Sequence, residues 1–582
     1  MRPAAALANP NILRVLRNAY VSTGKSIKKR PCLEEIATLE PGTVGLKAFD
    51  GKLNTFYGDG AAITHANPLF VPLRVPHHTT GAAPTKIHYC DQYNALAYVA
   101  AEYSGGTVRH HFLDDPGAWA AATSYTMGDF RRPTVENGFR YEITASSLDP
   151  GAWVTATAYP VGTFRRPTVA NGFRYEVTAI AGTGTSGGVE PTWPTTLGAT
   201  VIDNPGANQI TWTCRALIGT SGGSEPTWPL AIGDTVVDNE VTWTCRTFAV
   251  TDVNCPHTKE LTKAAEKIFA KGTADATTVR FCKTGDPRDW TAANDAGFLP
   301  VGNRAKGSDQ VTAVGPFQKS GLWVAFADNC QVWTVDPNPA NHSLTDSIEG
   351  IGTLYHRAAA SVSRDLFFPA QNGFRSVSLI AITDNLQDND VGSPIDALVR
   401  AQILTTDDPL SLYYPKLGQF WCFNGSTVWA YSFSRTAKIS AWSEFTLPFT
   451  IDDATVLNQE LYVRTGDDVY KVSESVHKDG VSSIPLVDIL MFFQDGKRPG
   501  VLKQFMGMDV IGTGQWTISH LFAADNQALE SQAYEYPAVT EPGDLHPVEL
   551  LSTRIAPHLQ HQKDEPAELS LLMLHYENLG VV

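Results

Sequence analysis

Short aromatic strands separated by tight turns recur along most of this sequence, and helical periodicity is almost absent. Segment 44–60, VGLKAFDGKLNTFYGDG, reads as a strand, an Asp-Gly turn and a second strand, and segments 321–335 and 426–442 repeat this design. A chain of hairpins this long needs an architecture that hides its sheet edges, and radial blades do so. The pattern therefore predicts an all-β protein with a β-propeller-like body.

The chain is also too long for one hydrophobic core. It has 582 residues, whereas single cores stop growing at roughly 250–300 residues, so at least two units are expected. No stretch of about 18 apolar residues occurs, and the first twenty residues lack the apolar region of a signal peptide. The eight cysteines are scattered without close Cys/His spacing, which favours synthesis in a reducing cytosol and predicts no metal site and no dense disulfide framework.

Two consecutive duplications interrupt the hairpin pattern. Segments 117–145 and 151–179 are nearly identical, and 184–215 is followed by its near copy 219–246. The order of the pieces is A, A, B, B. If one complete module is A followed by B, the inner pieces form a continuous module inserted into a surface turn of an outer one, since loop tips tolerate insertion.

These boundaries predict a propeller-like body with an inserted pair of small β modules, 151–215 being nested within 117–150 plus 216–246. The expected parts are an N-terminal arm and docking segment (1–44), the first part of the body (45–116), the modules (117–246), the remainder of the body (247–500) and a C-terminal β segment that completes the body or a platform (501–582).

Aromatic residues recur at matched positions in the two modules and are the candidate glycan-binding or partner-binding residues. They are Trp119, Tyr125, Trp153, Tyr159, Trp193 and Trp228. The spacing of Trp, Tyr and Gly resembles small chitin-binding-like carbohydrate modules, and aromatic faces stack well on sugar rings. The alternative is that the rings form the core, because a domain of about 60 residues has little else to bury.

A hydrolytic site is a weaker interpretation. Glu190 and Glu225 lie in Gly/Pro-rich turns where a carboxylate caps backbone amides, and no partner acid is apparent for a paired-acid glycosidase. The histidine pairs 77–78 and 110–111 are adjacent, so on strands they point to opposite faces and chelate poorly. The sequence predicts no enzyme, no cofactor and no metal.

Charge is unevenly distributed along the chain. The formal net charge is −15, yet residues 1–33 hold seven basic side chains and no acidic one. An acidic body argues against general nucleic-acid binding. The basic segment is interpreted as an arm that docks on an acidic neighbour or is solvated, with Lys28, Lys29 and Arg30 as its candidate docking residues.

Several segments resemble the tail nozzle proteins of short-tailed bacteriophages, also called tail tubular protein B or packaged-DNA stabilisation proteins. They are LRNAYVSTGKSIKKRPCLEEI (16–36), FAKGTADATTVRFCKTGDPRDW (269–290), the long run 321–379 and ELSLLMLHYENLG (568–580). The resemblance covers roughly 20–110 and 265–440. It implies strand structure across 263–271, where apolar spacing alone favours a helix, and we follow the resemblance there.

The resemblance implies a structural protein of the virion, made in the host cytoplasm. Such proteins form a ring, typically a hexamer, that extends the tail tube below the tail adaptor, closes the DNA channel and offers sites for tail fibres. An acidic channel wall would let genomic DNA slide, and the modules would project outward. Two alternatives stay open: a host-surface glycan-binding adhesin and a tail-associated glycosidase.

Overall fold

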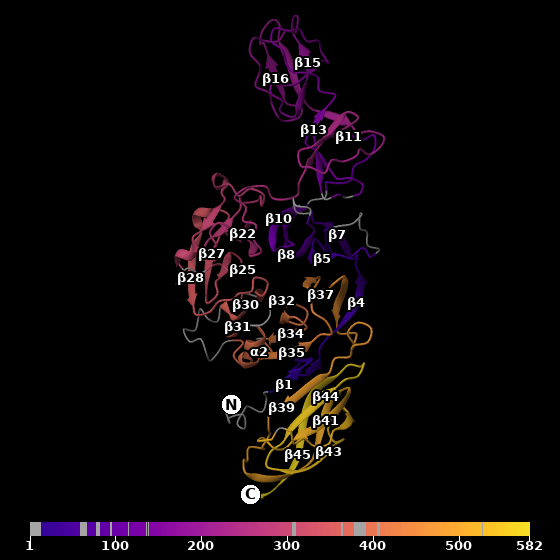
Figure 1. Cartoon of the computed structure of the whole chain (residues 1–582), viewed down its shortest axis with the longest axis vertical. Coiled ribbons are helices and arrows are strands. Elements are labelled where there is room, and N and C mark those ends of the chain that lie inside the picture. Colours follow the sequence, from indigo (N-terminus) through magenta and orange to yellow (C-terminus); the bar gives the residue numbers. More distant parts are fainter. Residues whose placement is uncertain are drawn as a thin grey trace.

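A computed structural model shows three parts in line along the long axis of the molecule (Figure 1). The nested modules form one end, a propeller lies in the middle and a C-terminal β unit forms the other end. The structure describes residues 13–58, 67–76, 82–93, 96–113, 116–135, 137, 139–304, 310–362, 365–377, 391–403, 408–434, 436–526 and 528–581.

Seven groups of three or four strands in the described part of the chain are the blades of the propeller; six are sheets of their own, and the group β32–β35 is one end of a nine-stranded sheet. In chain order they are β5 (Thr43–Phe49), β6 (Lys52–Tyr57) and β7 (Phe70–Arg74); β8 (Pro84–Tyr93), β9 (Leu96–Tyr103) and β10 (Thr107–Leu113); β21 (Leu261–Ala264), β22 (Lys267–Lys271), β23 (Val279–Phe281) and β24 (Gly297–Leu299); β25 (Ala313–Phe317), β26 (Gly321–Ala325), β27 (Asn329–Thr334) and β28 (Ser343–Glu349); β29 (Ala360–Val362), β30 (Asp365–Ala370) and β31 (Gly373–Ser376); β32 (Leu410–Tyr414), β33 (Gln419–Asn424), β34 (Thr427–Ser434) and β35 (Ile439–Thr446); and β36 (Asp453–Leu457), β37 (Glu460–Thr465), β38 (Asp468–Ser473) and β4 (Cys32–Thr38).

The blades close into a ring. The first strand of each blade contacts the first strand of the next, and β36 of the seventh blade contacts β5 of the first. A hydrophobic cluster fills each of the seven interfaces between blades; the last one packs Leu457 and Val469 against Leu53 and Phe70. The N-terminal strand β4 pairs with β38 and completes the seventh blade, so an early segment holds the ring shut.

The third blade confirms strand structure for 263–271, and the helical interpretation of this segment is wrong. Strands β21 and β22 pair through a two-residue turn, Ala265–Glu266. Both turn residues have positive φ, 45° and 58°, which is the backbone shape of a tight hairpin. Ala and Glu do not mark such turns in a sequence, whereas Asp50–Gly51 between β5 and β6 does, with φ of 51° and 68°.

The strands of the inserted modules pair in nested order. The outer module consists of β11 (Ser124–Thr126), β12 (Phe130–Arg131), β13 (Arg140–Ser146), β18 (Ile218–Thr220), β19 (Thr235–Asp238) and β20 (Val241–Arg246); the inner module consists of β14 (Phe164–Arg165), β15 (Phe173–Ile180), β16 (Thr200–Asp203) and β17 (Ile210–Ala216). Sheet β12-β13-β20-β19 joins the two outer pieces, and sheet β14-β15-β17-β16 joins the two inner pieces. Each module has its own buried cluster.

The inner module is inserted into the outer one between Ser146 and Ile218, which lie next to each other. The hydroxyl of Ser146 donates to the carbonyl oxygen of Ile218 at 2.8 Å, although 72 residues separate them. In the inner module the equivalent connection is a tight turn through Ala181 and Gly182, closed by a hydrogen bond from Gly184 N to Ala181 O at 3.1 Å. The inner module therefore replaces a surface turn.

We expect the outer module to survive removal of the inner one. In this variant residues 147–217 are replaced by Ala-Gly, the two residues that span the equivalent turn of the inner module. The replacement gives a short connection between Ser146 and Ile218, which are already hydrogen-bonded. Limited proteolysis of the variant should leave one protected chain, and its melting should keep the transitions of the propeller. Rapid digestion of 117–146 and 218–246 would contradict this prediction, whereas replacing 117–246 by a Gly/Ser linker is the control for the propeller alone.

The C-terminal unit is a pair of sheets with strands from both ends of the chain, and one of its sheets continues the sixth blade, because β1 pairs with β35 in parallel at Arg17 and Glu444. One sheet contains β1 (Leu13–Arg17), β39 (Val487–Met491), β44 (Ala556–His561), β41 (Gln515–Leu521) and β42 (Tyr534–Pro537); the other contains β2 (Ala19–Val21), β3 (Ile27–Lys29), β45 (Glu568–Val581), β40 (Val501–Thr513) and β43 (His546–Ser552). A buried cluster lies between them. The unit thus begins near Val487 rather than at 501, and segment 13–38 is built into sheets rather than forming an arm; residues 1–12 lie outside the described residues.

Helices contribute little to the described chain. They are α2 (Asp396–Ile403) and the 3₁₀ turns η2 (Ala292–Asn294), η3 (Val301–Arg304) and η4 (Pro339–Asn341). Within the described ranges, none of the helices has the length and apolar character needed to cross a lipid bilayer. All eight cysteines are buried and none is in a disulfide.

Candidate functional site

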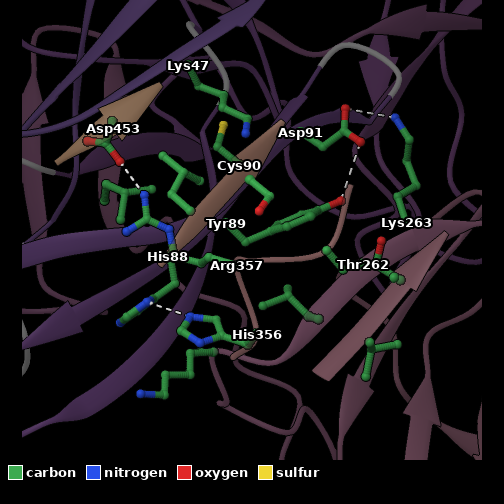
Figure 2. Close-up of a pocket in the computed structure, with 18 of the residues that line it drawn as sticks. Lys47, His88, Tyr89, Cys90, Asp91, Thr262, Lys263, His356, Arg357 and Asp453 are labelled. Atoms are coloured by element: carbon green, nitrogen blue, oxygen red, sulfur yellow. Dashed lines mark hydrogen bonds and ion pairs between the residues drawn. The ribbon is translucent and has the colours of Figure 1, made fainter. Parts of the chain in front are cut away.

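The axis of the propeller holds a cavity of about 390 Å³. Its walls come from the first strands β5, β8, β21, β25, β32 and β36 and from the segment that leads into β29, and charged side chains converge there (Figure 2). This volume suits a small ligand. It is far too small for a DNA duplex.

Arg357 is the centre of an ion-pair network on one side of this cavity. Its guanidinium lies 2.8 Å from Asp453 and 3.1 Å from Asp408, and Arg464 approaches Asp453 at 2.7 Å. Burial opposes ionisation of Asp408, but Arg357 and Lys86 overcome it and lower the pKa of this carboxyl to about 2. The network therefore connects the fifth, sixth and seventh blades, and each of these charged groups has a partner of opposite charge.

Two histidines and one lysine–aspartate ion pair also line the cavity (Figure 2). His356 Nε2 and His88 Nδ1 are 3.0 Å apart, and burial lowers the pKa of both rings, so they are neutral near pH 7. The Lys263 ammonium lies 3.0 Å from Asp91, which joins the third blade to the second (Figure 2). Both acids that line the cavity, Asp91 and Asp453, are therefore held in ion pairs. These pairs can stabilise the contacts between blades around the axis.

The predicted exposed aromatic platform is not formed by its four principal residues. Trp119 and Trp153 are 8% and 7% exposed, Tyr125 and Tyr159 only 3% and 2%. Each Trp donates its indole N–H to a buried acid, Trp119 to Asp238 and Trp153 to Asp203, at 2.8 Å in both modules. The prediction of exposure is wrong because modules of this size use their aromatic rings as core.

The remaining two candidates, Trp193 and Trp228, are half-buried at the edges of the module cores. Their rings pack at a tilt against Tyr175 and Tyr141, with centroids 4.3 Å apart in each module and interplanar angles of 41° and 37°. Their indole N–H groups donate to Glu190 and Glu225 at 2.8 Å. Both are only partly exposed and stay candidates for partner binding.

Glu190 and Glu225 occupy equivalent positions in different modules, and each caps a neighbouring backbone. Glu190 accepts a hydrogen bond from Thr168 N, and Glu225 accepts one from Thr134 N, both at 2.8 Å. Partial burial raises the pKa of both carboxyl groups, but these hydrogen bonds outweigh it and hold the pKa below the usual value. A glycosidase needs a protonated acid beside its partner, which this environment disfavours.

Two of the three predicted docking residues are structural instead. Arg30 is 2% exposed and pairs with Asp479, which is also buried, and it donates to the Thr446 carbonyl oxygen at 3.0 Å. Lys29 is 8% exposed, and its ammonium donates to the carbonyl oxygens of His477 and Lys563 at 2.8 Å. Only Lys28, 3.6 Å from Glu568, lies in a solvent-exposed pair. The docking prediction is therefore wrong for Lys29 and Arg30.

One group of metal-ligating side chains occurs among the described residues, outside the axial cavity. His110, Cys255 and His257 place one ligand atom each within 4.8 Å of the others. His110 and His111 do point to opposite sides, toward Tyr98 and Tyr103. The sequence interpretation missed the group because His110 lies 145 residues from Cys255, although the short spacing Cys255-Pro256-His257 was a usable signal. The pair 77–78 lies outside the described residues.

Sequence comparisons give no relative, since no protein-family model and no curated protein matches this chain. Solved structures show only loose likeness. A protein of unknown function from Bacteroides thetaiotaomicron has a TM-score of 0.22 at 11% identity over 59% of this chain and 96% of its own. An exo-β-1,3-galactanase from Phanerochaete chrysosporium has a TM-score of 0.21 at 9% identity over 54% of this chain and 95% of its own. At scores this low the likeness supports no inference about substrate or partner, and the propeller is assigned from strand order and contacts.

Proposed function

We propose that this chain is a structural protein of a phage virion, forming the nozzle at the end of a short tail tube. The observation that carries the proposal is the way the resembling segments assemble. Segments 20–110 and 265–440 are separated in sequence by the modules, yet they supply most strands of the first six blades and strand β4 of the seventh, whose strands β36, β37 and β38 lie beyond residue 440. A chance match would not be expected to fall on the strands of adjoining blades.

In this proposal DNA passes between subunits rather than through the propeller. The axial cavity has only about 390 Å³ and is lined by paired charges, so the conduit is the lumen of a homo-oligomeric ring, a hexamer by resemblance. The net charge of −15 would repel phosphate along that lumen and let genomic DNA slide. The ring would meet the tail adaptor on one side and carry tail fibres outside.

The C-terminal unit offers the surface best suited to subunit contact. Strand β43 is the edge of its five-stranded sheet and exposes 59% of Leu551. The neighbouring strands β40 and β45 expose Met506 by 49% and Leu579 by 51%. An edge strand with unpaired backbone groups and apolar side chains is a template for pairing with another chain.

The modules lie at the opposite end of the molecule and would project from the ring (Figure 1). They would reach a tail fibre or the host surface, with Trp193 and Trp228 as the remaining aromatic candidates. The adhesin alternative shares this placement, but it loses four of its six stacking residues to the module cores.

The ring is tested by negative-stain microscopy and light scattering of the purified chain. We expect closed rings, and we expect Leu551→Lys to give folded monomers because a charge on the edge strand opposes pairing. Leu197→Lys is the matched control, since Leu197 is 61% exposed in the inner module and should leave the rings intact. A wild-type chain that stays monomeric, alone and with tail adaptor, would remove the nozzle proposal.

A further inference from the structure

We propose that His110, Cys255 and His257 form a binding site for a zinc-class divalent metal ion at the base of the inserted modules. His110 lies on β10, the last strand before the insertion, and the other two follow the return of the chain to the propeller. The site is independent of the nozzle proposal, because it rests only on these side chains.

The three ligand atoms lie within 4.8 Å of one another, and the distance between two of them matches a tetrahedral ion. His110 Nδ1 and Cys255 Sγ are 3.5 Å apart. With metal–nitrogen bonds of about 2.0–2.1 Å and metal–sulfur bonds of about 2.3 Å, the nitrogen–sulfur edge of a tetrahedron is about 3.5 Å. A set of two imidazoles and one thiolate favours zinc and similar ions over calcium or magnesium, which prefer oxygen.

The imidazole of His110 is oriented for coordination through Nδ1. Its Nε2 lies 2.7 Å from the carbonyl oxygen of Thr258, so Nε2 carries the proton and donates it there. The lone pair of Nδ1 then faces Cys255. A backbone carbonyl that fixes the tautomer of a ligating histidine is the usual support around metal sites. The hydroxyl of Tyr98, 2.9 Å from Nδ1, donates to this lone pair, and a metal would take its place.

His257 completes the group and connects it to solvent. Its Nδ1 accepts a hydrogen bond from the backbone N–H of His110 at 3.2 Å, which coordination by this nitrogen would replace. The same residue lines a cavity of about 990 Å³ between the propeller and the outer module, beside Arg109, Phe139 and Leu230. This cavity supplies an entry path, and the fourth coordination position is open to water or to Tyr98.

A metal at this site would link the two chain segments that connect the insertion to the propeller, here called the stem. In the stem, strand β10 and the segment 248–250 already exchange backbone hydrogen bonds, Phe112 N to Phe248 O and Val250 N to His110 O, both at 2.9 Å. An ion bound to His110 and Cys255 would add a link across the same two segments just inside the propeller. On binding, the Cys255 thiol releases its proton to solvent and its sulfur bonds the metal. The modules would then leave the propeller in a fixed direction.

The test uses the untagged full-length chain, stripped with a chelator and titrated with Co²⁺. We expect one Co²⁺ per chain, a sulfur-to-cobalt charge-transfer band, visible bands of tetrahedral intensity, and displacement by Zn²⁺. Cys255→Ser should abolish the charge-transfer band, and His257→Gln, at the cavity side, should weaken Co²⁺ binding at least about tenfold. Both variants are checked for folding by circular dichroism.

The matched control is Cys214→Ser, a buried thiol in the inner module that lies outside the group. It should leave the cobalt spectrum unchanged. Failure of the folded wild-type chain to bind stoichiometric Co²⁺ would overturn the proposal. A charge-transfer band that persists in Cys255→Ser would also overturn it, because another thiol would then be the ligand.

Discussion

Arg30→Ala is expected to cost about 3–5 kcal/mol of the free energy of unfolding, because it leaves the buried Asp479 carboxylate without its partner. Both side chains are 1% exposed, so water cannot replace the lost contacts. Arg30 also donates from Nε to Asn18 Oδ1 at 3.0 Å, and Asn18 accepts from Thr446 N at 2.8 Å. One guanidinium thus joins the N-terminal segment, the sixth blade and the loop after the seventh blade.

Urea denaturation followed by tryptophan fluorescence measures this cost, and hydrogen exchange locates it. The amide of Leu33 donates to Asp479 Oδ1 at 2.9 Å, so exchange of the β4 segment should rise at least about a hundredfold. Lys28→Ala is the matched control, since its exposed pair with Glu568 contributes at most about 1 kcal/mol. A loss of less than about 1 kcal/mol for Arg30→Ala would contradict the prediction that this ion pair holds the three segments together.

The sequence predicted features that depend on local pattern. Alternating aromatic strands and the Asp50–Gly51 turn were readable because a hairpin of this kind requires positive φ at both turn positions. The nested pairing was readable because the duplicated pieces keep the order A, A, B, B. The turn Ala265–Glu266 has the same backbone shape without the usual residues, so only the resemblance indicated it.

The features that sequence reasoning missed depend on partners distant in the chain. Nothing local to Arg30 shows that Asp479, 449 residues away, is buried against it, so a run of basic residues looked like a docking arm. The same distance problem hid the ring closure by β4 and the approach of His110 to Cys255. Burial of an individual Trp is equally hard to predict, since core and exposed aromatics have the same residue spacing.

The second large effect is expected for Trp153→Ala, which should unfold the inner module and nothing else. Removing a buried Trp costs about 3–5 kcal/mol, and a unit of this size has only a few kcal/mol of stability. The change also takes one of two indole donors from Asp203, which accepts from Trp153 at 2.8 Å and from Trp212 at 3.3 Å. Because the sheet and core of the inner module are its own, the outer module should persist around it.

Limited proteolysis of the full-length chain distinguishes core from platform. For Trp153→Ala we expect rapid cleavage within 151–216, while the propeller and the outer pieces, held at Ser146 and Ile218, stay protected. Val154→Ala is the control, since Val154 is 52% exposed and its truncation should leave the protease pattern unchanged. Trp119→Ala should give the converse result, an open outer module with the inner one still folded, because the inner sheet does not need the outer strands. If Trp153→Ala instead stays fully protected and only loses binding to fibres or glycans, the indole acts at a surface and the buried position assigned to it is wrong.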